Sequence, residues 1–364
     1  MPEGHSVHRI ARQFAHNFVG HRVAVSSPQG RFADGAALLD GKTMTAARAV
    51  GKQMFLEFDG VLWLRVHLGI YGAWDFAGEI TTDATIRSAG GRMGQTNQRG
   101  TVQEDSLGAQ AEGTLDEIAL GEGVDAASAR SGADALDDAA LDDADGEDSI
   151  RSIGAPRRAR LRMAEQEKAG DTDYETFPPE PVGAVRVRLL TETAVADLRG
   201  PTACQVLDAA QVDAVIAKLG PDPLLDDSKA AEERFVTAVG KKPTPIGLLL
   251  MDQSVVSGIG NVYRAEMLFR ARLNPHTPGK LVPEETVREL WRDWAYLLDL
   301  GVRTGQMLTM DNLSDEDYAA AMASREDRHW VYKREGLPCR LCGTHIVLEE
   351  FGGRKLYWCP KDQA

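Results

Sequence analysis

Residues 1–5 read Met1-Pro2-Glu3-Gly4-His5, and the interpretation of the whole chain starts from this stretch. Removal of the initiator methionine would place the secondary amine of Pro2 at the terminus. An α-amino group has a reference pKa of about 7.7–8, so part of it is uncharged near neutral pH. Such an amine can attack an electrophilic carbon and form an iminium, with Glu3 as the adjacent proton donor. The alternative is that Pro2 only begins a helix and Glu3 favours the helix dipole.

The residues that follow this opening predict one helix leading into a mostly antiparallel sheet. Apolar side chains recur at helical spacing from Val7 to Phe18, and Gly20 is placed to end the helix. Alternating and β-branched segments then predict a series of strands, with an Asp-Gly turn at 59–60. The expected strands are 21–25, 43–50, 54–58, 61–67 and 71–76.

The charge of the chain is concentrated in one segment. The formal net charge is −14 over 364 residues, but residues 104–148 contain 15 acidic residues and a single basic one, Arg130. The remainder carries 40 acidic and 40 basic residues, so a basic groove for nucleic acid is not excluded. No run of about 18 apolar residues and no signal peptide is found, so we expect a soluble cytoplasmic protein without membrane association.

The acidic segment lies in a long stretch of unusual composition. Between Gly78 and Tyr174 there is no aromatic residue, and Ala, Gly, Asp and Glu dominate. Such a composition buries too little apolar surface to offset the entropy of ordering, so residues 82–182 are expected to be a disordered acidic insertion. A solvated tether is the simpler interpretation of this insertion, and an interaction tail is the alternative.

Order is expected to resume after the insertion. Two strands, 185–190 and 194–198, would complete the interrupted sheet, and the Gly-Pro-Asp-Pro stretch at 220–223 indicates a hinge into a helical half. The expected helices are 228–239, 245–251, 261–272, 284–300 and 314–324. The predicted class is therefore α+β. The predicted domains are a sheet domain (1–81 plus 183–222), the insertion (82–182), a helical domain (223–330) and a cysteine-containing hairpin (331–364).

The C-terminal cysteines have the spacing of a metal site. Cys339 and Cys342 form a C-x2-C pair, and after sixteen intervening residues Cys359 is followed by Asp362 at the position of a fourth ligand. Two such pairs separated by about 15–20 residues are typical of a structural zinc ribbon, and a carboxylate oxygen can ligate zinc. His345 is a less well placed alternative to Asp362. A hairpin held by packing without metal is the simpler alternative to a zinc site.

Three further motifs have both a structural and a functional interpretation. Residues 257–263 read SGIGNVY, which brings backbone N–H groups and Asn261 to a helix N-terminus, where anions bind. Lys52 follows Gly51 at the start of an apolar strand, where a lysine is often only an edge charge. Residues 67–72 read HLGIYG, a strand-end turn that either packs in the core or enters a base stack. In addition, the FGGR turn at 351–354 would offer Arg354 to a phosphate.

Together these motifs resemble one family, the formamidopyrimidine-glycosylase/endonuclease VIII family of DNA repair enzymes. The resemblance rests on the MPEG opening, Gly51-Lys52, the HLG at 67–69, the GIGN at 258–261 and the C-terminal finger, in the family order. It covers about 1–81 and 185–363. The opening Pro-Glu-Gly-His and the LRGP at 198–201 are closer to the endonuclease VIII branch of actinobacterial type, because the formamidopyrimidine branch typically opens Pro-Glu-Leu-Pro.

The resemblance implies a fold and a chemical role for the N-terminus. The implied fold is an N-terminal antiparallel β-sandwich with flanking helices, hinged to a helix–two-turn–helix domain and a zinc-ribbon β-hairpin, with DNA across the cleft between them. By the same resemblance, Pro2 attacks C1′ of a damaged nucleotide and forms a Schiff base. Glu3 acts in protonation and sugar-ring opening, and Lys52 contacts a phosphate and assists elimination.

The resemblance also assigns the residues that hold DNA. His67, Asn261 and Arg354 would contact the phosphates that flank a flipped nucleotide, with Arg354 also aiding the second elimination. Ile70 and Tyr71 match the region that fills the gap left in the duplex, as base extrusion requires. The sequence departs from the family pattern in the insertion, in Asp362 where a cysteine is usual, in Ser6 where an acidic residue is common, and in Gly69 where a wedge residue would be larger.

The implied function is that of a bifunctional DNA glycosylase/AP lyase of base excision repair. Its expected substrate is double-stranded DNA with oxidised bases, pyrimidines favoured over purines, or with abasic sites, its expected cofactor is structural zinc, and its expected state is a monomer. The main alternative is a catalytically weak or inactive damaged-DNA-binding paralogue of the same fold. A zinc-ribbon interaction module joined to an unrelated enzyme gives no reason for Pro2, Lys52 and Asn261 to occur together.

Overall fold

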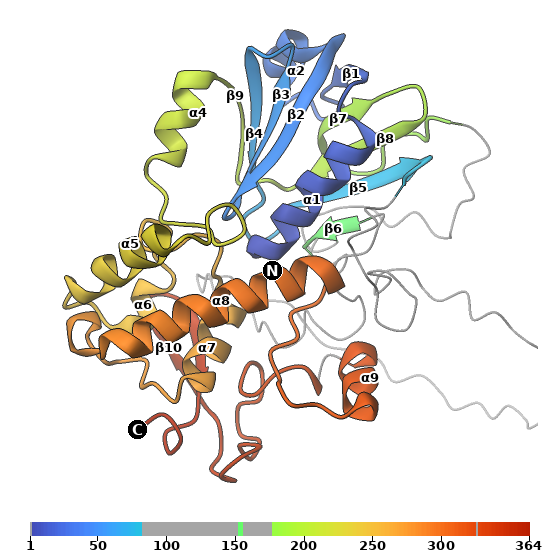
Figure 1. The fold of residues 1–364 in the computed structure, drawn as a ribbon. Helices are drawn as coiled ribbons and strands as arrows, with labels where there is room; N and C mark the ends of the chain where they lie inside the picture. The colour runs from blue at the N-terminus through green and yellow to red at the C-terminus, as the bar shows by residue number, and fades with distance from the viewer. Residues whose placement is uncertain (1, 82–151, 156–176, 325–326) are drawn as a thin grey trace, which may run out of the picture.

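The computed structural model describes residues 2–81, 152–155, 177–324 and 327–364 (Figure 1). The chain is α+β, as predicted, with an antiparallel sheet in the N-terminal half, a group of helices after it and a two-stranded hairpin near the C-terminus. Within these described residues, none of the helices combines the length and apolarity that crossing a membrane requires.

In the described part of the chain, nine antiparallel strands form the sheet, in the order β6-β5-β8-β7-β1-β2-β3-β4-β9. Strand β1 joins the two halves, because Arg22 and Val23 pair with β2 whereas residues 24–26 pair with β7. The strands are β1 (Arg22–Ser26), β2 (Lys42–Val50), β3 (Gln53–Phe58), β4 (Leu62–His67), β5 (Ala73–Gly78), β6 (Ser152–Gly154), β7 (Val185–Leu190), β8 (Ala194–Arg199) and β9 (Ala203–Asp208).

The two halves of the sheet enclose one apolar core. Leu56 and Leu64 from the β3–β4 half belong to the same buried cluster as Trp74 and Leu198 from the β5–β8 half. Helix α1 (Gly4–Asn17) adds its apolar face, and the ring of Phe14 meets that of Trp74 edge-on with centroids 4.8 Å apart. Because side chains from both halves share this core, the sheet folds over itself, as a sandwich does. The packing of α1 also fixes the position of the chain's N-terminus (Figure 1).

The helical half and the C-terminal hairpin share a second core. Trp291 and Trp294 of α8 pack in the same buried cluster as Leu356 and Tyr357 of β11, so the hairpin is anchored on the helices. The elements here are α4 (Ala209–Ile216), α5 (Lys229–Gly240), α6 (Ile246–Leu249), α7 (Asn261–Arg270), the 3-10 turn η4 (Gly279–Leu281), α8 (Glu284–Thr304), α9 (Asp315–Ala323), β10 (Val347–Glu350) and β11 (Lys355–Trp358).

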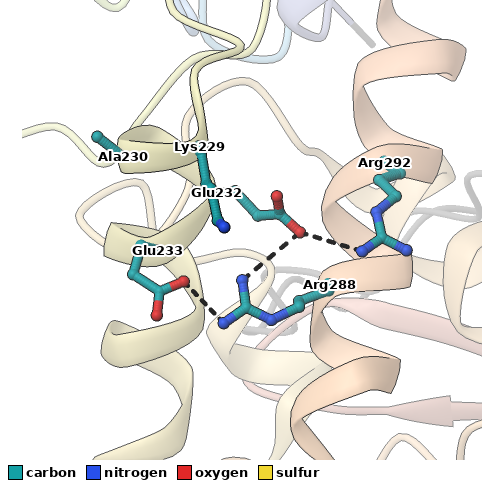
Figure 2. A pocket seen from close by; sticks show the side chains of 6 residues that line it. All are labelled: Lys229, Ala230, Glu232, Glu233, Arg288 and Arg292. Atoms are coloured by element: carbon teal, nitrogen blue, oxygen red, sulfur yellow. Dashed lines mark hydrogen bonds and ion pairs between the residues drawn. The ribbon is translucent and has the colours of Figure 1, made fainter.

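A cluster of ion pairs joins α5 to α8 (Figure 2). Glu232 forms ion pairs with both Arg288 and Arg292, at 3.7 and 3.5 Å, and Glu233 pairs with Arg288 at 2.7 Å. These groups line a surface hollow together with Lys229. Exposed ion pairs of this kind contribute about 0.2–1 kcal/mol each. The carboxylates and guanidiniums that line the hollow therefore pair with one another and link α5 to α8.

The predicted elements agree with the structure to within a few residues at their ends, with some additions. Helix α2 (Ala33–Leu39), strand β9 and helix α4 were not predicted. The prediction of disorder throughout 82–182 was wrong for Ser152–Gly154, which is strand β6 and pairs with β5. It was also wrong at the end of that range, where the Pro179 and Val182 carbonyls accept hydrogen bonds from arginine side chains of β7 and β8. Residues 82–151 and 156–176 lie outside the described part of the chain.

Candidate functional site

Three segments that are far apart in the sequence come into contact at Gly4, Gly51 and Gly258. The N–H of Gly4 donates to the carbonyl of Gly258 at 2.9 Å, and the backbone of Gly51 lies against the same residue. A Cβ atom on Gly258 would stand 2.9 Å from the Trp294 ring and 3.4 Å from the Gly4 Cα. Gly51 and Gly258 also have positive φ angles, 56° and 94°, which side-chain-bearing residues rarely adopt. The glycines of the MPEG, Gly-Lys and GIGN motifs thus allow one close contact between the sheet half and the helical half.

Glu3 completes the N-terminus of helix α7. Its side chain is 1% exposed, and its two carboxylate oxygens accept from the N–H groups of Gly260 and Val262 at 2.8 and 2.9 Å. The first N–H groups of a helix have no partner within the helix, and the positive end of the helix dipole favours an anion there. Because Glu3 is held in this way, the adjacent and buried Pro2 is also fixed at the junction of the two halves.

Two basic side chains, Lys52 and Arg264, interact electrostatically with the Glu3 carboxylate. Lys52 is partly buried, and this burial lowers the pKa of its ammonium below the ordinary lysine value. The negative charge of Glu3 opposes that shift, while Arg354 and Arg264 reinforce it. Lys52 and Arg264 thus both interact electrostatically with Glu3 and with Arg354, so three positive charges lie within electrostatic range of one another near this carboxylate. Such a group suits a phosphate-bearing ligand.

Asn261 and Arg264 tie helix α7 to the hairpin turn. The Asn261 side-chain amide donates to the Lys355 carbonyl at 2.7 Å, and Arg264 donates to the same carbonyl at 2.9 Å. Arg264 also donates to the Asn261 side-chain oxygen, and burial lowers its pKa to about 10. An amide nitrogen has two N–H donors, and the Lys355 contact uses one of them. Asn261 therefore positions the turn that carries Arg354, besides any contact with a ligand.

The remaining predicted DNA-contacting residues lie on two turns. Arg354 is exposed at the β10–β11 turn, which the Phe351 N–H closes by donating to the Arg354 carbonyl at 2.8 Å. His67 ends β4, and burial together with the charges of Lys52 and Arg65 lowers its pKa. Beyond His67, the turn into β5 exposes two large apolar side chains, Ile70 at 39% and Tyr71 at 36%.

The predicted residues thus lie at the N-terminus, next to the start of β3 and the end of β4, and at the hairpin turn, which are linked as follows. Glu3 contacts the start of α7, Lys52 interacts electrostatically with Glu3, Arg354 and His67, and Ile70 and Tyr71 follow His67 on the same turn.

Three residues that contact these elements or the chain leading to them, Asp222, Arg264 and Glu266, were not singled out from the sequence. The Asp222 carboxylate accepts from the Gly51 N–H at 2.7 Å, and the same oxygen lies 2.7 Å from Nε2 of His8. Arg264 was also missed, although it falls one helical turn after Asn261 and so shares its face. The buried Glu266 accepts from the backbone N–H groups of residues 330–332 and thereby fixes the chain that leads to the hairpin. Only Arg264 had a signal in the sequence, which was its spacing from Asn261.

The four predicted metal ligands come together in the hairpin domain. The ligand atoms of Cys339, Cys342, Cys359 and Asp362 all lie within 4.8 Å of one another, and His345 is not among them. Backbone N–H groups of Leu341 and Asp362 point at the sulfurs of Cys339 and Cys359, at 3.5 and 3.4 Å. Three thiolates and one carboxylate are a donor set that tetrahedral zinc accepts. The residues therefore fit a structural zinc ion, which they would hold between the two ends of the hairpin.

Arg272 supports the one oxygen ligand of this set. It pairs with the second oxygen of Asp362 at 3.2 Å, and its guanidinium lies 5.2 Å from the centroid of the Phe269 ring. Such an outer contact orients a ligating carboxylate.

Family models match three successive parts of the chain. The formamidopyrimidine-DNA glycosylase N-terminal domain matches residues 1–103, the formamidopyrimidine-DNA glycosylase H2TH domain matches 219–312, and the zinc finger found in FPG and IleRS matches 336–364. The chain belongs to the formamidopyrimidine-DNA glycosylase/endonuclease VIII family of base-excision-repair DNA glycosylases, as the sequence motifs predicted.

Particular relatives place it within that family. The chain is 32% identical to Endonuclease 8 1 of Mycobacterium tuberculosis over 364 residues, covering all of both proteins. It is 36% identical to the formamidopyrimidine-DNA glycosylase of Thermus thermophilus over 153 residues, covering 41% of this chain and 55% of that protein.

Solved structures share the fold. The MutM (Fpg) protein of Thermus thermophilus superposes with a TM-score of 0.58 at 21% identity, covering 100% of this chain and 98% of that one. The wild-type Lactococcus lactis Fpg, solved in complex with DNA containing N7-benzyl-Fapy-dG, superposes with a TM-score of 0.62 at 16% identity, covering 100% and 99%. Another Lactococcus lactis Fpg structure, with DNA containing an abasic site, gives 0.59 at 15% identity, covering 100% and 99%.

Proposed function

We propose that this chain is a bifunctional DNA glycosylase/AP lyase that excises oxidised bases, pyrimidines favoured, from double-stranded DNA and cuts the strand at the resulting abasic site. One observation carries the proposal. The Glu3 carboxylate accepts from two N–H groups at the start of α7, so the adjacent Pro2 lies at the contact between the sheet half and the helical half. With Met1 removed, the Pro2 amine would adjoin Glu3, whose carboxylate interacts electrostatically with Lys52.

The first chemical stage uses Pro2 and Glu3. The Pro2 nitrogen forms a bond to C1′ as the bond between C1′ and the base breaks, and the base leaves with a proton. The Glu3 carboxylate takes the proton that the Pro2 nitrogen loses on bonding to C1′ and passes it to the ring oxygen O4′, which leaves C1′ and opens the sugar. The product is a covalent iminium between Pro2 and the opened deoxyribose. A secondary amine reaches this state without the burial that a lysine nucleophile needs.

The second stage breaks the strand. The iminium withdraws electrons and acidifies the C2′ hydrogens, so loss of one proton is followed by departure of the 3′ phosphate in β-elimination. A second elimination expels the 5′ phosphate, and water then releases the sugar fragment and regenerates Pro2. In this proposal Lys52 contacts the departing phosphate and assists its elimination. Arg354, exposed at the hairpin turn, assists the second departure.

Extrusion of the damaged nucleotide is assigned to the remaining predicted residues. Flipping a base costs a few kcal/mol, and groups that occupy the vacated stack offset part of that cost. The exposed side chains of Ile70 and Tyr71 have the apolar surface for this role. His67 and Asn261 then hold the phosphates on either side. Support for DNA as the substrate comes from the Lactococcus lactis Fpg complexes with damaged DNA. The preference for pyrimidines follows from the likeness of the Pro-Glu-Gly-His opening to the endonuclease VIII branch.

Borohydride trapping on a duplex with a single abasic site tests the covalent step. The reductant converts the iminium to a stable amine, so the wild-type protein is expected to migrate as a protein–DNA adduct. Pro2→Gly, which replaces the secondary amine by a primary one, is expected to lower the adduct yield at least about tenfold. Lys280→Ala removes an exposed lysine from η4 and serves as the matched control with unchanged yield. Full trapping by Pro2→Gly would place the nucleophile elsewhere.

Base preference needs a separate measurement. Single-turnover incision of matched duplexes with one oxidised pyrimidine or one oxidised purine is expected to favour the pyrimidine. DNA binding without any adduct or incision would identify the chain as a non-catalytic damaged-DNA-binding paralogue.

A further inference from the structure

The turn that carries Ile70 and Tyr71 is tightly enclosed on one side. We call residues 68–72, between β4 and β5, the wedge turn. A Cβ atom on Gly69, whose φ is 68°, would collide with the Thr202 side chain. Gly200 lies so close to the Tyr71 carbonyl that a Cβ there would stand 2.8 Å from its oxygen. The absence of a larger side chain at Gly69 therefore follows from the packing of the turn against residues 200–202.

Strand β6 encloses the other side of the wedge turn. The Ala155 N–H donates to the Gly72 carbonyl at 2.9 Å, and Gly154 pairs with Ala73. A Cβ atom on Gly154 would stand 2.5 Å from the Gly72 oxygen and 2.6 Å from the Ala73 Cα. Gly154 also has a φ of 133°, so two features of this position favour glycine. The backbone of β6 is therefore in direct contact with the end of the wedge turn.

The register of β6 confines its pairing to the start of β5, next to the wedge turn. Its three residues pair with Ala73, Trp74 and Asp75, which directly follow the wedge turn, and not with residues 76–78. Ile153 is 2% exposed and belongs to the core cluster that contains Trp74, so β6 is anchored by burial as well as by its backbone bonds. An edge strand of three residues adds little to a sheet of this size, but this one holds a functional turn.

We propose that β6 is a positioning element that presets the wedge turn, so that Ile70 and Tyr71 enter the base stack without first being ordered. The inference rests on the proposed gap-filling role of these two side chains. A turn fixed before binding avoids the entropy cost of ordering at the moment of insertion. The strand lies between β5 and β7 in the chain, and the proposal gives residues 152–155 a part in lesion recognition within duplex DNA.

Two variants of β6 test the proposal on paired substrates. Gly154→Ala introduces the colliding Cβ, and Ala155→Pro removes the N–H that donates to Gly72. Incision is compared on an abasic site in a duplex and on the same strand alone, because only the duplex has an opposite stack to fill. Both variants are expected to lose about tenfold in duplex incision and to keep single-strand incision within about twofold of wild type. Gly240→Ala, at an exposed position with open space around it, is the control with neither loss.

A double-variant comparison separates positioning from general destabilisation. Ile70→Ala with Tyr71→Ala is expected to reproduce the duplex-selective loss, and adding Gly154→Ala is expected to cause no further loss, since both changes act on one step. An unchanged ratio of duplex to single-strand incision in both β6 variants would overturn the proposal. Equal loss on both substrates would also overturn it, because β6 would then only maintain the fold. A wild-type protein that incises neither substrate would overturn the proposed function itself.

Discussion

Gly260→Ala is the most informative single substitution, because it acts on Glu3 without changing Glu3. A Cβ atom at this position would lie 2.4 Å from the Glu3 carboxyl carbon and 2.6 Å from one of its oxygens. The carboxylate must therefore move off the start of α7, and its hydrogen bonds from Gly260 and Val262, at 2.8 and 2.9 Å, are lost. A hydrogen bond to a charged group contributes about 1.5–3 kcal/mol, so the loss is about 3–6 kcal/mol if water does not replace the donors.

Thermal unfolding and borohydride trapping measure the two consequences. A loss of that size is expected to lower Tm by roughly 10 °C. The displaced Glu3 takes the adjacent Pro2 with it, so the initial trapping rate on abasic duplex is expected to fall at least about tenfold, since catalysis of this kind depends steeply on positioning. Gly240→Ala, at the exposed end of α5, is expected to leave both values near wild type. Wild-type Tm together with wild-type trapping in Gly260→Ala would refute the idea that α7 positions the N-terminus.

Further predictions concern Lys52, Arg264 and the metal ligands. Burial lowers the pKa of Lys52 in the folded state, so the unfolded chain keeps this proton to a higher pH. The free energy of unfolding should therefore rise with pH between the lowered pKa and the ordinary lysine pKa. Lys52→Met should remove that rise in urea titrations and raise the free energy of unfolding at pH 7 by about 1 kcal/mol, while the incision rate falls. A rise that persists in this variant would come from another titrating group. Arg264→Leu should cost about 2–4 kcal/mol in the unfolding free energy and slow incision, because the Lys355 carbonyl loses one donor; unchanged melting and rates would contradict this. Asp362→Ala should lose zinc by atomic absorption and lower Tm, whereas Asp362→Cys should retain one zinc per chain; full zinc in Asp362→Ala would exclude the carboxylate as a ligand.

The sequence was sufficient to predict sites whose residues lie at fixed, short distances along the chain. The zinc ligands could be identified because Cys339, Cys342, Cys359 and Asp362 follow a pattern set by the geometry of one ion. The glycines of the three motifs could be noticed but not explained. Their reason is a contact between Gly4, Gly51 and Gly258, which lie on three segments and meet only in the folded chain.

Residues that act through long-range contacts could not be predicted. Asp222 holds the N–H of Gly51, a residue 171 positions earlier, and nothing in the hinge sequence indicates that partner. Arg264 receives its role from the Lys355 carbonyl, 91 positions later. Composition was also misleading for β6, because three residues without an aromatic side chain give no strand signal. Their order comes from burying Ile153 and from pairing with Ala73–Asp75.

The helix α8 shows the opposite case. Its apolar spacing was sufficient to predict a helix, and the structure adds an acidic first turn, Glu284 and Glu285, that suits the helix dipole. Its end differs, because it extends to Thr304 and stops at Gly305, which has a left-handed φ of 74°. The Arg9 guanidinium of α1 lies against that glycine and donates to the Val302 carbonyl in the last turn at 2.8 Å, a partner that no local pattern reveals.

Peptide mapping of the reduced protein–DNA adduct tests the central claim most directly. The wild-type protein would be trapped with borohydride on abasic duplex, digested and analysed by mass spectrometry. We expect Met1 to be absent and the deoxyribose fragment to be attached to the nitrogen of Pro2. A fragment attached to Lys52 or to any other side chain, or an adduct formed by chains that retain Met1, would contradict it.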